Sequence, residues 1–170
     1  MTTELLAIED IPSKFDRRYV ATDRENPAVK YAVNIARLTC ACTDFSERRR
    51  DFPAGDVRRV CAHLYEKLYQ TKAERRFDPL VQLFIRYGRE MLTYRTVAAA
   101  RGRFIIGFPF GPRHLRAIGI VDGKSMLATY NLGLYEWAEG ETPLTRMQAA
   151  EVLERMRQAY PEAFARGGTA

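Results

Sequence analysis

Two short motifs, Cys40-Ala-Cys42 and Cys61-Ala-His63, constrain this chain more than any other feature, because they hold all three cysteines and one of the two histidines. Thiolates and neutral imidazoles are zinc ligands, usually arranged as a tetrahedron. A Cys-x-Cys pair at a strand end can direct both sulfurs to one side, and a Cys-x-His pair at a helix start can face the same point. The sequence therefore predicts one structural Zn²⁺ with Cys40, Cys42, Cys61 and His63 as ligands.

The alternative is that the cysteines are small buried apolar residues and that His63 is an ordinary helix residue. The two matched pairs favour the metal. Zinc binding in comparable peptides contributes on the order of 10 kcal/mol to folding, which a small hairpin-and-helix module needs. Four protein ligands leave no coordination position open for water, so the expected site is structural and not catalytic.

The same residues resemble the SWIM zinc finger over residues 17–70. The resemblance rests on Cys-x-Cys, a variable gap and Cys-x-His, with YAVNI before the first pair, CTDF following its first cysteine, and CAHLYEKL at the second pair. Two features depart from the family: Ala62 replaces a lysine that is frequent there, and the loop is long and basic. The resemblance implies zinc ligation by the four residues, and binding to nucleic acid or to proteins of DNA-processing machinery.

Hydrophobic periodicity predicts an α+β chain of two modules. Residues 1–72 are expected to form a ββα zinc finger, with strands over 14–23 and 30–42, a loop over 43–56 and a helix over 57–70. Residues 79–165 are expected to form an α+β module, in which helices over 80–92 and 145–160 flank an antiparallel β-meander. Its strands are expected over 103–110, 114–121, 125–132 and 134–138. A charged segment ending in Asp78-Pro79 marks the expected boundary.

Two local signals in the second module are specific. Asp122-Gly123 between apolar runs predicts a two-residue hairpin turn. Thr145 followed by Gln148 predicts a helix capping box. The sequence after the hairpin turn resembles the end of a phosphate-binding loop, but Ile118 stands where that motif needs glycine. Because no convergent acid–base set is found either, the sequence predicts a protein that is not an enzyme.

The formal net charge is +6, and it is concentrated in two blocks. Residues 48–76 hold nine bases and four acids (9 − 4 = +5), and residues 86–124 hold eight bases and two acids (8 − 2 = +6). Basic blocks of this kind favour a polyanionic partner. The expected partner is nucleic acid, DNA more than RNA, contacted at its phosphates by Arg48, Arg49, Arg58 and Arg59.

The alternative function is a protein-interaction module, an adaptor or inhibitor that docks on a nucleic-acid-processing enzyme through its basic faces or through the helix over 147–160. Three cysteines are too few for a disulfide framework, which favours a reducing compartment. The N-terminal residues carry no basic lead-in, and no apolar run reaches the roughly 18–20 residues that span a membrane. We therefore expect a cytoplasmic protein, with association with the nucleoid as an alternative and no membrane partner.

Overall fold

A computed structural model describes residues 5–165 and shows an α+β protein with two antiparallel sheets. The chain divides into two compact units, which we call the N-terminal unit (residues 6–89) and the C-terminal unit (residues 90–165, together with Leu5). The division lies between Arg89 and Glu90, whereas the sequence placed it between residues 72 and 79. The helix over residues 79–87 thus belongs to the N-terminal unit, because its apolar face is buried there.

The N-terminal unit contains a three-stranded antiparallel sheet in the order β1-β2-β3. Its strands are β1 (Tyr19–Thr22), β2 (Lys30–Asn34) and the short β3 (Thr39–Cys40). In the turn between β1 and β2, the Asp23 carboxylate accepts the backbone N–H groups of Glu25 and Asn26. The register pairs Val33 with Cys40, which fixes the position of the first cysteine.

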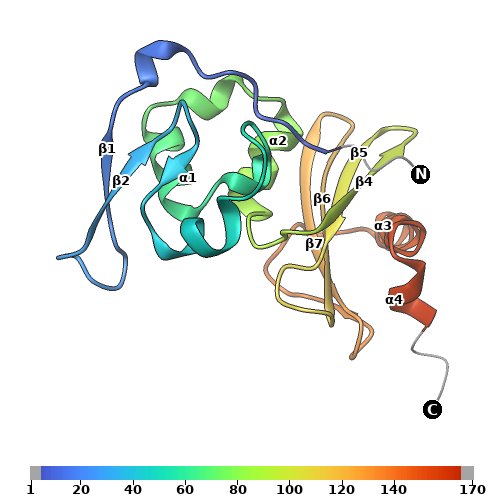
Figure 1. The fold of residues 1–170 in the computed structure, drawn as a ribbon. Helices are drawn as coiled ribbons and strands as arrows, with labels where there is room; N and C mark the ends of the chain where they lie inside the picture. The colour runs from blue at the N-terminus through green and yellow to red at the C-terminus, as the bar shows by residue number, and fades with distance from the viewer. Residues whose placement is uncertain (1–4, 166–170) are drawn as a thin grey trace. The chain divides into compact units, whose positions relative to one another are not determined.

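Helical segments complete the N-terminal unit (Figure 1). In chain order they are η1 (Ser13–Phe15), the π-helical η2 (Phe45–Arg49), η3 (Val57–Arg59), α1 (Ala62–Gln70), η4 (Ala73–Arg76) and α2 (Pro79–Tyr87). Helix α1 packs against all three strands and buries Leu64 and Leu68. Helix α2 begins at an Asp78 cap with proline at its first position, a standard helix start, and it buries Leu80 and Phe84.

The C-terminal unit contains a five-stranded antiparallel sheet in sequential order β4-β5-β6-β7-β8. Its strands are β4 (Tyr94–Ala99), β5 (Gly102–Gly107), β6 (His114–Val121), β7 (Lys124–Asn131) and β8 (Glu136–Trp137). Strand β4 was not expected from the sequence. Gly119 on β6 allows close packing, because a Cβ there would lie 2.5 Å from the Cδ1 atom of Phe104. The packing of the core therefore requires glycine at this position.

Helix α3 (Arg146–Ala159) covers this sheet and is followed by α4 (Pro161–Ala165). Val152 and Met156 of α3 pack into a core with Phe104, Ile106 and Leu115. The Thr145–Gln148 capping box is present as predicted, and the predicted hairpin turn is present with positive φ at Asp122 and Gly123. Within residues 5–165, no helix has the length and apolar character needed to cross a membrane.

Candidate metal centre

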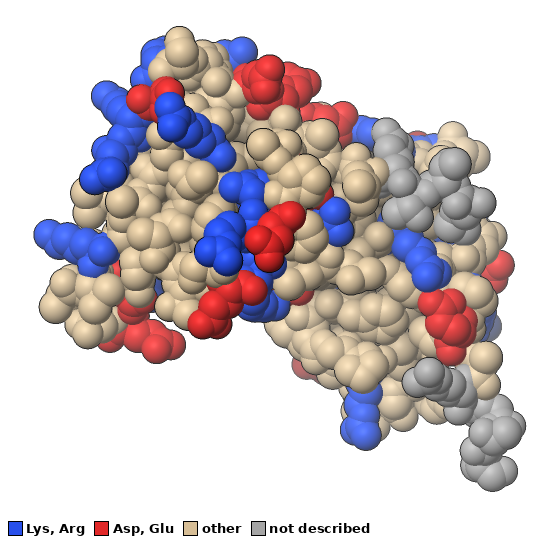
Figure 2. Space-filling model, viewed as in Figure 1, with Lys and Arg blue, Asp and Glu red and all other residues tan. Residues whose placement is uncertain are grey.

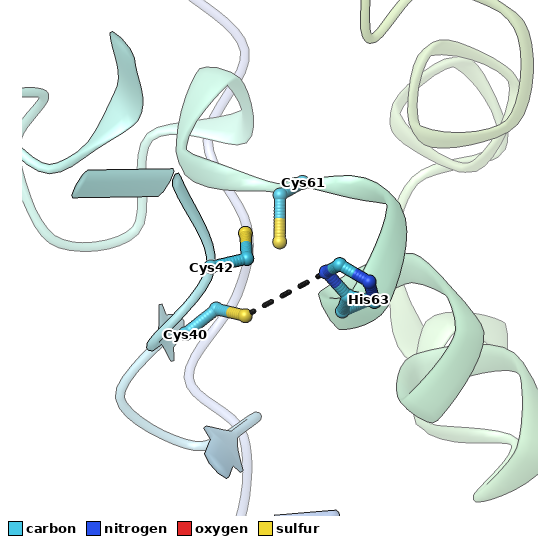
Figure 3. Close-up of side chains that lie close together, drawn as sticks. All are labelled: Cys40, Cys42, Cys61 and His63. Atoms are coloured by element: carbon cyan, nitrogen blue, oxygen red, sulfur yellow. Dashed lines mark hydrogen bonds between the residues drawn. The ribbon is translucent and has the colours of Figure 1, made fainter. Parts of the chain in front are cut away.

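The structure brings the four predicted ligands together in the N-terminal unit (Figure 3). Cys40 ends β3, Cys42 follows two residues later, Cys61 caps the N-terminus of α1, and His63 lies in the first turn of α1. One ligand atom from each residue lies within 4.8 Å of the other three. The centre therefore joins the end of the small sheet to the start of the helix that packs on it.

The geometry of the cluster can hold one metal ion. In a tetrahedral site with metal–sulfur bonds of about 2.3 Å, neighbouring sulfurs lie about 3.8 Å apart. The Sγ atom of Cys40 lies 3.9 Å from Nδ1 of His63, and no pair of ligand atoms is more than 4.8 Å apart, so metal binding would draw the most distant atoms together by up to about 1 Å. All three cysteines are buried, at 8% exposure or less, which shields the thiolate–metal bonds from water.

Backbone geometry explains why the sulfurs converge. A turn with a left-handed residue, Leu38 at φ 50°, reverses the chain from β2 into β3. The N–H of Ala41 then donates to Ala32 at 3.0 Å, which continues the pairing beyond Cys40. Beyond Cys42 the chain enters a helical turn, and the N–H of Phe45 points at Cys42 Sγ at 3.4 Å. This amide donates to the sulfur and stabilises negative charge on it.

The three thiols influence one another's ionisation. Hydrogen bonds from Cys40 and Cys61 stabilise the Cys42 thiolate and lower the pKa of Cys42 far below the usual range for a thiol. The same contact to Cys42 raises the pKa of Cys40. For Cys61 the hydrogen bond to Cys40 lowers the pKa, but Cys42 and burial outweigh it and raise the pKa to about 11. These hydrogen bonds favour the thiolate form of Cys42, and a bound cation would replace the shared protons.

Two residues that the sequence reasoning missed support the histidine. The rings of Tyr31 and His63 lie with centroids 4.8 Å apart, and the Tyr31 hydroxyl donates to the Asp23 carboxylate at 3.2 Å. Backbone N–H donors, first that of Asn26, lower the pKa of Asp23 and keep it ionised. The one sequence feature that could have indicated this role is the position of Tyr31 on the strand before the first cysteine pair.

Arg49, expected to contact phosphate, lies inside the protein at 2% exposure. Its Nε donates to Asp44 at 2.6 Å. Its terminal nitrogens donate to the backbone carbonyls of Arg58 at 3.1 Å, Val60 at 2.9 Å and Arg89 at 3.0 Å. The segment over 43–56, predicted as a simple loop, is partly helical and is held against the second ligand pair by this guanidinium.

Of the other three arginines expected to contact phosphate, two also make contacts within the protein. Arg58 forms an ion pair with Asp56 at 2.7 Å and lies over the ring of Phe52 at 4.2 Å. Arg59 donates to the carbonyls of Leu38, Arg50 and Phe52. Arg48 is the exception: its side chain is 49% exposed and has a long contact of 3.4 Å to Asp44. Of the four arginines, only Arg48 presents its charge largely to solvent.

Searches with protein-family models, among curated proteins and among solved structures give no match. The centre is therefore interpreted from its own residues and geometry.

Proposed function

We propose that the N-terminal unit is a SWIM-type zinc finger, with one structural Zn²⁺ bound by Cys40, Cys42, Cys61 and His63. The observation that carries the proposal is the convergence of three buried sulfurs and one imidazole nitrogen within 4.8 Å. Three thiolates and an imidazole are a soft donor set that suits zinc, and they complete a tetrahedron. In this proposal β1, β2 and α1 would supply the ββα elements of the finger, and β3 and η2 would be additions to them.

The proposed role of the chain is non-enzymatic binding of nucleic acid, as an accessory protein that contacts phosphates. The charge of the N-terminal unit supports this role: residues 6–89 include twelve exposed Lys and Arg residues and six exposed Asp and Glu residues. Several of these basic side chains are visible on the N-terminal unit in Figure 2. Because Arg49, Arg58 and Arg59 serve the fold, the phosphate contacts are assigned to exposed bases, with Arg48 and the neighbouring Arg50 first.

The test is fluorescence anisotropy of the zinc-loaded protein with labelled single- and double-stranded DNA and RNA over a range of salt concentrations. We expect affinity to fall log-linearly with salt. An Arg48→Gln/Arg50→Gln variant should bind less tightly and, if each arginine contacts one phosphate, lower the salt slope for duplex DNA by about 2. The matched control is Arg113→Gln/Arg146→Gln, which removes the same charge from exposed positions of the C-terminal unit. Equal loss in both variants would mean that only net charge matters.

A protein-interaction module is the second candidate, and exposed apolar residues of the C-terminal unit favour it. Phe110, Leu134 and Tyr135 are each 65% exposed. Their loops are neighbours, since the N–H of Leu132 donates to the carbonyl of Arg113 at 2.8 Å. Absence of nucleic-acid binding even at low salt would favour this function, and a pull-down with the zinc-loaded protein would then be the appropriate experiment.

A further inference from the structure

A row of neighbouring aromatic and basic side chains, on α1, on α2 and just past the end of α2, takes no part in the metal centre. Tyr65 and Tyr69 lie one turn apart on α1 with ring centroids 6.2 Å apart. The guanidinium of Arg89 lies 4.5 Å from the Tyr65 ring centroid. The guanidinium of Arg86 lies 5.8 Å from the Tyr69 centroid and 5.9 Å from the Tyr87 centroid. We call these five residues the Tyr–Arg surface.

The Tyr–Arg surface is not part of the hydrophobic core. Tyr69 is 55% exposed and Tyr87 is 39% exposed. The helices bury other residues instead, among them Leu64 and Leu68 of α1 and Phe84 of α2. Large aromatic rings left in water beside guanidinium groups contribute little to folding. They are the side chains that binding surfaces use, because a ring offers a wide contact area with few torsions to immobilise.

The charge around this surface is positive. Residues 62–89 contain six bases and three acids (6 − 3 = +3). Each acid already has a structural place: Glu66 accepts a hydrogen bond from Gln70 at 3.0 Å, Glu74 is buried, and Asp78 caps α2. An anionic ligand would meet exposed Arg86 and the exposed bases of the α1–α2 connection, Lys72, Arg75 and Arg76, in a segment whose net charge is positive.

Aromatic rings that lie beside cationic side chains can distinguish between anionic ligands, because they favour ligands with exposed flat faces. Bases of a duplex are stacked on each other and present only their edges, whereas unpaired bases present flat faces that stack on tyrosine and on guanidinium planes. We propose that the Tyr–Arg surface stacks unpaired bases of single-stranded nucleic acid while the adjacent arginines contact its phosphates. This inference rests on the proposed nucleic-acid binding and specifies the form of nucleic acid and the surface that recognises it.

The metal centre lies at the start of the helix that carries part of the Tyr–Arg surface, so it should influence binding at that surface. Helix α1 starts at Cys61, and His63 lies in its first turn, so the ion fixes the end of the helix that carries Tyr65 and Tyr69. Binding of single strands should therefore depend on metal loading even though the bases do not touch the metal. Chelation should weaken oligonucleotide binding, and restoring zinc should recover it.

The experiment measures anisotropy of the zinc-loaded full chain with oligo(dT), oligo(U), an abasic oligodeoxynucleotide with the same number of phosphates, and a DNA duplex. Tyr69→Ala and Tyr87→Ala should each weaken binding to oligo(dT) or oligo(U) by about tenfold. Neither should change binding to the abasic strand. The control is Tyr135→Ala, which removes a tyrosine that is 65% exposed in the C-terminal unit and should have no effect. Circular dichroism confirms that each variant is folded.

The outcomes separate this inference from the function on which it rests. Equal affinity for the abasic strand and for oligo(dT), unchanged by either tyrosine substitution, overturns base stacking and leaves phosphate binding intact. Preference for the duplex over single strands also overturns it. Absence of binding to every oligonucleotide overturns both proposals. The comparison of oligo(dT) with oligo(U) shows whether the surface discriminates between DNA and RNA.

Discussion

The imidazole of His63 lies against the phenol ring of Tyr31, with the two ring planes inclined at 48°. Tyr31 is on β2 and His63 is on α1, so the contact joins the hairpin to the helix at the metal centre. The Tyr31 hydroxyl is in turn held by Asp23 in the turn between β1 and β2. A residue of the sheet thus orients the one nitrogen ligand of the cluster.

Replacing Tyr31 should weaken metal binding without removing a ligand. Tyr31→Leu leaves the His63 ring unsupported, and we expect zinc affinity to fall by about tenfold. Tyr31→Phe keeps the ring contact and loses only the bond to Asp23, so its effect should be smaller. Competition with a chromophoric chelator measures both affinities. Equal affinity in wild type and Tyr31→Leu would show that the ring contact is incidental.

Both the zinc content of the protein and the stability of its N-terminal unit should depend on Cys61. The purified protein should contain one zinc per chain by mass spectrometry under native conditions, and Cys61→Ala should lose it. Because binding free energy is folding free energy in such small units, the N-terminal unit should unfold on chelation. Ala41→Ser, an exposed change between two ligands, is the matched control and should retain the metal. A stable N-terminal unit without metal would contradict the prediction.

Arg49 should be among the most costly arginines to remove. Arg49→Ala removes the Arg49 donors to the buried carbonyl of Val60 and to the carbonyl of Arg58, and it removes the shorter of the two ion pairs of Asp44. We expect a loss of about 3 kcal/mol in the free energy of unfolding of the zinc-loaded protein. Arg48→Ala, one position earlier and largely exposed, should change it by less than about 0.5 kcal/mol. Urea denaturation followed by circular dichroism gives both values, and equal values would refute this structural role.

Tyr160 gives the C-terminal unit a predictable response to alkali. Burial raises the pKa of this phenol above its ordinary value of 10.0. The protonated form is therefore favoured in the folded state, and the stability it confers is complete below pH 10 and lost as the pH rises through the folded pKa. Tyr160→Phe should remove this loss. The comparison of the two proteins from pH 9 to pH 11 isolates the phenol from other groups that titrate there.

The same substitution should be nearly neutral or slightly stabilising at pH 7. Within the described residues the buried Tyr160 hydroxyl has no hydrogen-bond partner, so removing it relieves an unsatisfied polar group. The ring contacts with Phe108 and with the Arg95 guanidinium remain available to phenylalanine. A loss of more than about 1 kcal/mol in thermal or urea denaturation would indicate a hydroxyl contact that the structure does not contain.

Features that depend on side-chain type and local spacing could be read from the sequence. The convergence of Cys40, Cys42, Cys61 and His63 was predictable because cysteine and histidine have few other reasons to occur in matched pairs. The Asp122-Gly123 turn and the Thr145 cap were predictable because each is decided within a few residues. The α+β class followed from the same local patterns.

Features that depend on backbone partners could not be predicted in this way. Three of the four acceptors of Arg49 are main-chain carbonyls, which any sequence supplies, so a structural arginine and a phosphate-binding arginine have the same appearance in a basic loop. Asp78-Pro79 is both a boundary signal and a helix start, and only the burial of Leu80 and Phe84 decides between the two. Strand β4 was missed because Arg95 and Thr96 interrupt its apolar pattern.

The contacts of Arg49 determine how much of the N-terminal unit must be included when the metal-binding segment is grafted into another protein. Its guanidinium connects the segment between the ligand pairs to the carbonyl of Arg89, two residues past the end of α2. A graft that copies only the span from the first cysteine to the histidine would contain all four ligand residues. It would lack the segment after α2 whose carbonyl this guanidinium contacts. A graft that keeps this contact must therefore extend to Arg89, because a chimera cut just after α1 would leave the buried Arg49 guanidinium without the Arg89 carbonyl.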